Sequence, residues 1–353
     1  MSETEIKELG ANDMAQWRAL VASSPEGSAY NDPDYLAALC EATGARFRII
    51  GAWRADKLEG GVALFERWTV AGRIVSPRLL LYYSGPVLAR HTTKYPSEQT
   101  SRHVDVLGRL AQHVAGMGFG SVVLKAMPSL TDVRPFLAAG WDASPAYSYI
   151  VRLDDLPQQW ARVEQNLRRL VKRCTDRDGI TFAADDDFEA FWRLHELTLS
   201  RKGAALYLPK PQFARFFERI KAQGLARIYH ARLPDGTAIA TQLVLTGPYA
   251  ATHSVCAGGD PAHAKLGAQA FLRWRVFEHL AGLGHKSNDL TDAALNSITH
   301  FKSQLGGDLA PTFVLESPRT KRYAAVTSVG NAARRGINVA AGAARMLTVG
   351  VKS

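Results

Sequence analysis

The hydrophobic and polar positions of the first half alternate between periods typical of helices and of strands. Segments 13–23 and 33–42 repeat apolar residues with the helical period, and Asp32 followed by Pro33 is a typical helix start. Segments 47–53 and 62–70 are apolar runs of strand length joined by a turn, which predicts a β-hairpin. The other elements predicted here are a strand over 77–87, a helix over 98–116, a strand over 121–126, a short helix over 132–139 and a strand over 148–153. Helices that alternate with hairpins and single strands predict an α/β fold with a mixed sheet.

The second half follows a similar plan. The elements predicted there are helices over 156–178, 188–200 and 211–223, strands over 225–232, 238–246 and 249–256, a helix within 260–284, a strand over 287–290 and a helix that carries Lys302. The hairpin residues 60–63 read Gly-Gly-Val-Ala, and residues 236–239, which lie 176 positions later, read Gly-Thr-Ala-Ile. A duplicated domain is the economical explanation of this repeat.

The length of 353 residues allows two domains that each bury a core. We predict an N-terminal domain over 1–153, a C-terminal domain over 154–316 that begins with a basic linking helix, and a tail over 317–353. The tail holds seven Lys and Arg residues and no acid, so it carries seven of the ten net positive charges. It is expected either to contact an anionic membrane surface or to form a loosely helical extension.

Composition and cysteine usage set the class of protein. Apolar residues make up 46% and charged residues 22% of the chain, which is typical of a globular protein. No charge-free apolar run approaches about 20 residues, and the acidic N-terminus lacks the apolar segment of a signal peptide. Cys40, Cys174 and Cys256 have no paired spacing, which argues against a disulfide framework or a zinc site and favours a reducing compartment. We therefore expect a cytoplasmic protein, with peripheral contact at the inner membrane face through the tail.

The helix predicted over 156–178 is strongly basic. Its apolar residues share one stripe, and the cations Arg168, Arg169, Lys172 and Arg173 lie on the other faces. An array of cations on a rigid helix can bind the phosphates of a nucleotide, a tRNA or a lipid pyrophosphate. The same pattern is typical of a solvated helix face, so both interpretations stay open.

Candidate chemistry gathers between residues 265 and 307. The helix start Lys265-Leu266-Gly267-Ala268 would present free backbone N–H groups to an anion, and Gly267 would allow close approach. Asp289 and Asp292 at a strand end can hold or deprotonate an amine, although acids at such positions also cap turns. Lys302 can stabilise a developing negative charge, a role that most surface lysines do not have.

Several common catalytic motifs are missing from the sequence. It contains no Walker loop, no HExxH and no repeated GxGxxG, so nucleotide hydrolysis, zinc proteolysis and Rossmann chemistry are not supported. His253 and Ser254 are neighbours on a predicted strand and face opposite sides of it, so a hydrolase nucleophile pair is not expected.

Several segments taken in order resemble FemAB-like acyltransferases, a branch of the GNAT superfamily. These segments are GSAYNDPDYLAAL at 27–39, NLRRLVKRCTDRDGITF at 166–182, DGTAIATQLVL at 235–245, YAATHSVCAGGD at 249–260, LGAQAFLRWRVFEHLAGLG at 266–284, NDLTD at 288–292 and FKSQLGG at 301–307. The similarity covers most of residues 28–316.

The resemblance implies two tandem GNAT-like domains and an enzyme that transfers an acyl or aminoacyl group. The donor would be a thioester of the acyl-CoA type or an aminoacyl-tRNA, and the acceptor an amine or hydroxyl of a cell-envelope or polysaccharide precursor. In this family the lysine of the Phe-Lys motif, which is Phe301-Lys302 here, is associated with the reaction centre, and the acceptor attacks the donor directly. No tightly bound cofactor is implied, since acyl-CoA would be a substrate.

The donor stays open at this stage. The coenzyme A loop of GNAT proteins is only partly represented at 265–268, and no long coiled-coil arm of the kind found in some tRNA-dependent members is present in the sequence. The alternative to a transferase is a non-catalytic protein that uses the basic helix and the tail to hold nucleic acid or anionic lipid. Binding of nucleic acid would weaken steeply with added salt.

Overall fold

The computed structural model describes residues 3–78 and 80–328. The elements of the first half are, in chain order, β1 (Thr4–Glu8), the 3-10 helix η1 (Ala11–Asp13), α1 (Met14–Ser23), η2 (Ala29–Asn31), α2 (Pro33–Thr43), β2 (Arg46–Arg54), β3 (Lys57–Thr69), β4 (Gly72–Val75), β5 (Val87–Leu88), α3 (Pro96–Gly116), β6 (Ser121–Lys125), α4 (Arg134–Ala138) and β7 (Asp142–Arg152). Those of the second half are α5 (Leu156–Arg162), α6 (Gln165–Asp176), β8 (Thr181–Ala183), α7 (Phe188–Arg201), α8 (Lys210–Ala222), β9 (Ala226–Arg232), β10 (Ala238–Leu245), β11 (Thr252–Gly259), η3 (Pro261–Leu266), α9 (Ala268–Gly282), β12 (Ser287–Asp289), α10 (Ser297–Ser303) and β13 (Asp308–Glu316).

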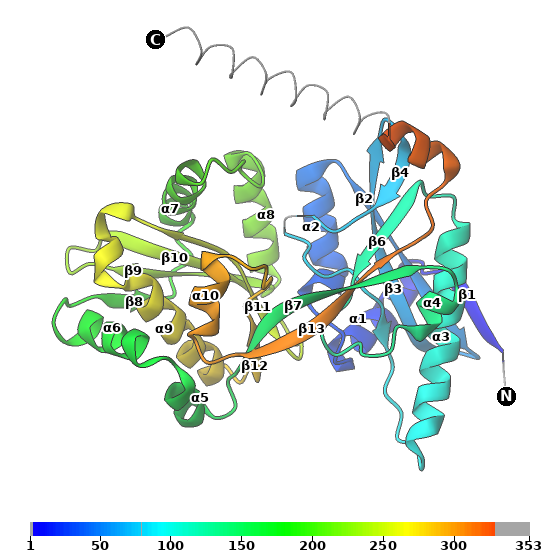
Figure 1. Ribbon diagram of the computed structural model, residues 1–353, viewed down its shortest axis with the longest axis horizontal. Coiled ribbons are helices and arrows are strands. Elements are labelled where there is room, and N and C mark those ends of the chain that lie inside the picture. The colour runs from blue at the N-terminus through cyan, green and yellow to red at the C-terminus, as the bar shows by residue number, and fades with distance from the viewer. Residues whose placement is uncertain (1–2, 79, 329–353) are drawn as a thin grey trace, which may run out of the picture.

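The strands form one mixed sheet that runs through two lobes, one from each half of the chain (Figure 1). Its order is β1-β2-β3-β4-β6-β13-β7-β12-β11-β10-β9-β8, with β5 paired to β3. The predicted α/β class with a mixed sheet is therefore confirmed.

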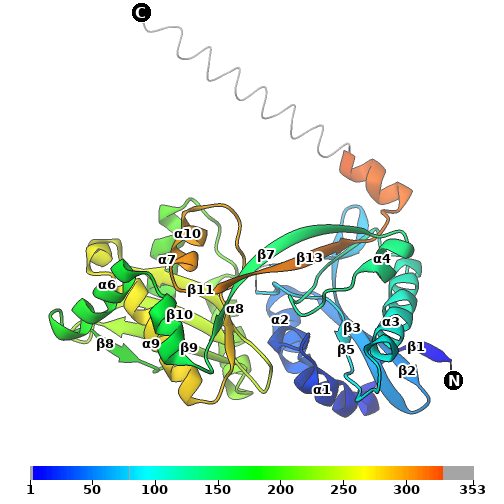
Figure 2. The same cartoon turned by 60° about the horizontal axis from the view of Figure 1, so that its bottom comes forward.

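The long strands β7 and β13 connect the two lobes, as Figure 2 shows. They pair antiparallel over the whole length of β13, from Asp308 opposite Ile150 to Glu316 opposite Asp142. The C-terminal end of β13, residues 314–316, also pairs with β6. The C-terminal end of β7, residues 150–152, pairs with β12. A strand from residues 308–316 thus completes the sheet of the first half, and the division at residue 153 stays a prediction.

A shared apolar core holds the lobes together. One cluster of buried side chains includes Trp17 and Tyr35 of the first half together with Phe216 and Phe217 of α8. The rings of Tyr35 and Phe216 lie 5.5 Å apart between centroids in an edge-to-face arrangement. An apolar interface of this kind restricts relative motion of the lobes, so a site built between them keeps its shape.

Most predicted helices and strands are confirmed to within a few residues, but the predicted strand over 77–87 is wrong. Among the described residues of this segment, 77–78 and 80–87, the structure has only an isolated bridge between Arg78 and Leu81 and the start of the two-residue β5. The segment is apolar because Leu81 and Tyr83 are buried in the shared core. Its prolines, Pro77 and Pro86, lack the N–H group that a central strand needs.

The helix predicted over 156–178 is two helices, α5 and α6. Val163 is extended, with φ −66° and ψ 135°, and the next residue, Glu164, donates its N–H to the carbonyl of Gln304 at 2.9 Å. Contact with the segment after α10 therefore interrupts the helix. Within residues 3–78 and 80–328 we found no helix with the length and apolar character that crossing a bilayer requires.

Candidate active site

The parallel strands β11 and β12 separate after a short paired region. They pair only where Thr252 lies opposite Asn288 and His253 opposite Asp289. Beyond this point β11 continues beside β10, and the register shifts so that Leu243 lies opposite Cys256 but Val244 opposite Ser254. This bulge at Val255 distorts the edge of β11 that has left β12. A cavity of about 620 Å³ lies along that edge.

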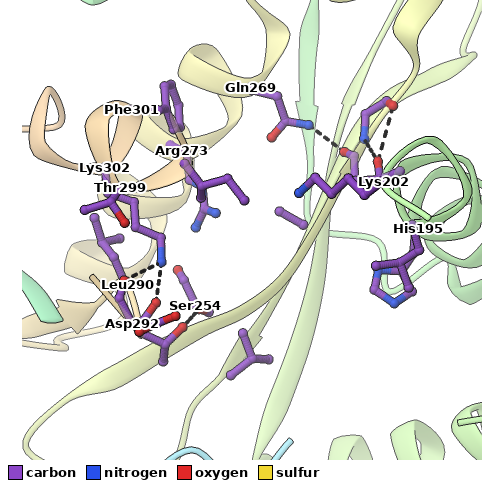
Figure 3. A pocket seen from close by; sticks show the side chains of 18 of the residues that line it. His195, Lys202, Ser254, Gln269, Arg273, Leu290, Asp292, Thr299, Phe301 and Lys302 are labelled. Atoms are coloured by element: carbon purple, nitrogen blue, oxygen red, sulfur yellow. Dashed lines mark hydrogen bonds between the residues drawn. The ribbon is translucent and has the colours of Figure 1, made fainter. Parts of the chain in front are cut away.

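Both halves of the chain line the cavity. The first half contributes Tyr30, Arg78, Leu80 and Tyr82, and the second half contributes residues from the end of α7, from β11, from the start of α9, from the loop after β12 and from α10. Figure 3 shows side chains from these elements pointing into the same space. The site is therefore formed by the assembly of the two lobes.

Lys302 of α10 is one of the charged groups that line this cavity (Figure 3). Its side chain is only 8% exposed, and its ammonium donates to the carbonyl oxygens of Thr291 and Asp292, the latter at 2.8 Å. Burial and the nearby Arg273 lower the pKa of Lys302 from 10.5 to about 8. The ammonium is thus held in place and is charged at neutral pH.

The loop that holds Lys302 is backbone-strained. Thr291 and Asp292 have φ values of 46° and 66°, in the left-handed region that glycine favours. Such conformations cost of order 1–3 kcal/mol each and persist only where the surroundings impose them. Here the Thr291 hydroxyl donates to the Ser254 carbonyl at 2.5 Å, and the Thr291 N–H donates to Asp289 at 2.7 Å.

The two predicted acids lie in different surroundings. Asp289 is fully buried and does not line the cavity; its carboxylate accepts hydrogen bonds from Tyr83 at 2.7 Å and from Ser148. Asp292 lines the cavity and accepts a hydrogen bond from Tyr82 at 3.1 Å. Asp292 is therefore placed to meet a ligand, whereas Asp289 fixes the loop.

The predicted donor loop lies at the other end of the cavity. Gly267, with φ 82°, precedes the first turn of α9, and no side chain caps that turn. Gly267 and Ala268 line the cavity, whereas Lys265 is exposed and lies outside the lining. A Cβ at position 267 would come within 2.9 Å of Leu170, which explains the glycine by close packing as well as by its φ.

The basic helix α6 lies behind the donor loop, outside the cavity lining. Arg173 donates to the carbonyl oxygens of Lys265 and Leu266 at 2.7 and 2.8 Å, so it supports the loop. Arg169 and Lys172 are exposed and Arg168 is half-buried. Phe301, in contrast, is part of the cavity lining next to Lys302.

The cavity contains functional candidates that the sequence did not suggest. Arg273 of α9 is buried on the face of the helix that also carries Phe277, and an arginine on an apolar stripe is the signal that was available. His195 of α7 is buried, and neither ring nitrogen has a hydrogen-bond partner among the described residues. Burial and the nearby Lys202 lower the pKa of His195 to about 4, so its ring is neutral at pH 7.

In the described part of the chain, no three His, Cys, Asp or Glu side chains are grouped as a metal site requires.

Comparisons with known proteins agree with this geometry. The family model of the acetyltransferase (GNAT) domain matches residues 161–303, a range that includes β11, β12 and α10. A sequence search among curated proteins gave no significant match.

Solved structures resemble nearly the whole chain. The structure of FemX is 12% identical with a TM-score of 0.68, over 88% of this chain and 96% of FemX. The C-terminal domain of a protein described as a lysylphosphatidylglycerol synthetase, from Agrobacterium fabrum, is 14% identical with a TM-score of 0.58, over 91% and 96% of the two chains. A tandem GNAT protein from the clavulanic acid biosynthesis pathway is 15% identical with a TM-score of 0.52, over 90% and 98%.

Identities this low carry information about the fold, and the family model carries the domain assignment. The β11–β12 cleft and α10 lie inside the matched range, and the similar structures cover both halves of the chain. Residues 161–303 therefore match the acetyltransferase (GNAT) domain, and the chain as a whole has a fold similar to that of FemX and of the tandem GNAT protein.

Proposed function

We propose that the protein transfers an acyl or aminoacyl group from a thioester or an aminoacyl-tRNA to an amine or hydroxyl of a cell-envelope or polysaccharide precursor. The observation that carries this proposal is Lys302, fixed by two backbone carbonyls in a cleft that opens where β11 leaves β12. The likeness to FemX and to the lysylphosphatidylglycerol synthetase domain supports an acceptor of the cell envelope.

The proposed reaction is a direct attack. The acceptor nitrogen or oxygen forms a bond to the donor carbonyl carbon, and the carbon–sulfur or carbon–oxygen bond to the donor then breaks. Negative charge develops on the carbonyl oxygen, where the Lys302 ammonium stabilises it. Asp292 accepts the proton that the acceptor loses, and the departing thiolate or alkoxide takes a proton from solvent. No covalent bond to the enzyme is formed.

The proposed donor position follows from the two ends of the cavity. Gly267 and Ala268 offer the uncapped start of α9 to the donor phosphates, while the bulged edge of β11 at Val255 receives the acyl chain. In this proposal the reacting carbonyl lies between the helix start and Lys302.

A donor screen tests the proposal. A true donor stabilises the native state by mass action, so the melting temperature should rise with acetyl-CoA, a longer acyl-CoA or an aminoacyl-tRNA. The donor that stabilises the protein should then be consumed when extracts of envelope precursors are added, and Lys302→Met should stop that turnover. Absence of stabilisation by all three donors, with no turnover, would contradict the transferase function.

One observation favours a binding function instead. Arg169 and Lys172 of α6 are exposed, outside the cavity lining, and could contact nucleic acid or anionic lipid. Most of the tail, residues 329–353, lies outside the described residues, so membrane contact there rests on composition alone. Salt-sensitive nucleic-acid binding that is lost on removal of residues 317–353, with no activity in the donor screen, would favour this second function.

A further inference from the structure

Arg273 of α9 holds a guanidinium inside the protein, and no carboxylate of residues 3–78 and 80–328 forms an ion pair with it. The residue is 7% exposed, and its Nε and Nη1 atoms are buried without a hydrogen-bond partner among the described residues. Burial lowers the pKa of Arg273 only to about 10, so the group stays charged at neutral pH. A buried cation without a counter-charge is costly, and proteins rarely keep one unless a ligand completes it.

The contrast with a second arginine of the same helix shows what a structural role looks like. Arg275, two residues further on, donates to Glu278 at 2.8 Å and to Thr175 at 3.2 Å. Its charge is paired with Glu278, and its side chain is 34% exposed. Arg273 has neither an ion-pair partner among the described residues nor much exposure to solvent, so the packing of α9 does not explain why this position carries a charge.

Arg273 belongs to the cavity lining, beside the proposed reaction centre. Figure 3 shows its guanidinium reaching into the same part of the cavity as the Lys302 ammonium and the Ser254 hydroxyl. The two cations are close enough that Arg273 contributes to the lowered pKa of Lys302. An anion that enters this space meets both of them.

The charged side chains of the cavity indicate the sign of the ligand. Cations outnumber carboxylates in the lining, which holds Arg78, Arg201, Lys202, Arg273 and Lys302 but only the carboxylates of Asp260 and Asp292 among the described residues. An anionic ligand would therefore be attracted to this space, and a carboxylate matches the planar fork of a guanidinium with two parallel hydrogen bonds.

We propose that Arg273 binds a carboxylate of the substrate, so that this enzyme acts on a carboxylate-bearing ligand and not on a simple acyl group with a neutral acceptor. The inference rests on the proposed transferase function for the identity of the ligand as a substrate. The carboxylate has two possible sources, the far end of a dicarboxylic acyl donor or the carboxylate of an amino-acid-like acceptor.

Binding measurements on the full chain test the carboxylate directly. Succinate should raise the melting temperature and bind in calorimetry, whereas succinamide, its neutral analogue, should do neither. Arg273→Met should weaken succinate binding by about ten- to a hundredfold, the range for a charge-assisted pair. Arg275→Gln on the same helix is the matched control and should bind succinate like the wild type.

Two comparisons separate the sources. A larger stabilisation by succinyl-CoA than by acetyl-CoA, lost in Arg273→Met, assigns the carboxylate to the donor. A larger stabilisation by glutamate than by its diamide, lost in the same variant, assigns it to the acceptor. Stabilisation by inorganic phosphate alone, with no response to any of these carboxylates, would overturn the assignment.

Stability without ligand provides a readout that a structural arginine would not give. Arg273→Met removes an unbalanced buried charge and keeps an apolar chain of similar length, so its melting temperature should rise. A lower melting temperature together with unchanged succinate binding refutes the proposal. Carboxylate binding without turnover in any donor screen would support the role of Arg273 and contradict the transferase function. Turnover that needs Lys302 but is equal in wild type and Arg273→Met would support the transferase function and contradict the role of Arg273.

Discussion

The cations of α6 and the cations of the cavity differ in their surroundings more than in their chemistry. On α6, Arg169 and Lys172 face solvent and Arg173 donates to backbone carbonyls. In the cavity, Lys302 and Arg273 are buried and have lowered pKa values. A dense row of charges in a sequence attracts notice, but exposed charges are screened by water and salt. Desolvation gives the few buried cations the strength to bind or polarise a ligand.

The comparison extends to carboxylates. Asp289 is fully buried and bound by Tyr83 and Ser148, whereas Asp176 at the end of α6 is exposed. When a buried carboxylate is removed, the groups that donated hydrogen bonds to it lose their partner. When an exposed carboxylate is removed, water replaces it as the acceptor. The four predictions below test this distinction between buried and exposed charge.

Loss of the Lys302 ammonium should have the largest effect. Lys302→Met should lower kcat by about a hundred- to a thousandfold, since it removes a preorganised group that acts on the transition state. The matched control is Lys172→Met on α6, which should keep kcat within about twofold of the wild type. Steady-state kinetics with the donor found in the screen measure kcat for both variants. Equal losses of kcat would show that buried Lys302 and exposed Lys172 do not differ in their importance for the reaction.

Asp289→Ala should lower the free energy of unfolding by about 2–3 kcal/mol, because the hydroxyls of Tyr83 and Ser148 and the N–H of Thr291 lose their acceptor. Asp176→Ala should change it by less than about 0.5 kcal/mol. Urea unfolding monitored by circular dichroism gives both values. If the two variants were equally stable, Asp289 would not be the structural support of the Lys302 loop.

The pH dependence follows from the lowered pKa of Lys302, which is about 8 in the folded protein compared with 10.5 ordinarily. Burial is the largest cause of this lowered pKa; Arg273 and Lys125 also oppose the charge of Lys302, and Asp292 and Asp289 favour it. Above pH 8 the ammonium deprotonates, so kcat should fall by about tenfold per pH unit.

Stability should change in the opposite direction over the same range. Between about pH 8 and 10.5 the unfolded chain binds a proton at Lys302 that the folded chain does not, so the contribution of this group to stability rises with pH. Rate profiles and urea unfolding at pH 7, 8 and 9, compared between wild type and Lys302→Met, separate the two effects. A rate that does not decline above pH 8 would show that the ammonium is not needed.

The smallest expected effect is on the KM for the donor, and it should differ between Arg173 and Arg169 of α6. Arg173→Gln loosens the donor loop at Lys265 and Leu266, so the KM for the donor should rise by about three- to tenfold with little change in kcat. Arg169→Gln should leave both constants unchanged. A stronger effect from Arg169 than from Arg173 would return the exposed face of α6 to the list of substrate contacts and favour the nucleic-acid or lipid function.

The sequence by itself determined the local elements. Helical and strand periods predicted α1, α2, α3 and the β2–β3 hairpin, because these elements are specified by which face of a short segment is apolar. The apolar segment 77–87 and the helix break at Val163 were mispredicted, because core contacts and the Gln304 carbonyl decide them.

The tertiary structure decided how the site is assembled. The pairing of β13 with β6 joins residues almost 200 positions apart, and no local pattern encodes such a contact. The motif residues Gly267, Asp292, Phe301 and Lys302 could be named from the sequence, and all four line one cavity. The burial that hides Asp289, lowers the pKa of Lys302 and leaves Arg273 unbalanced depends on what packs around each side chain. Periodicity reports the face on which a residue lies, and only the folded chain determines the dielectric and the partners that give the residue its chemistry.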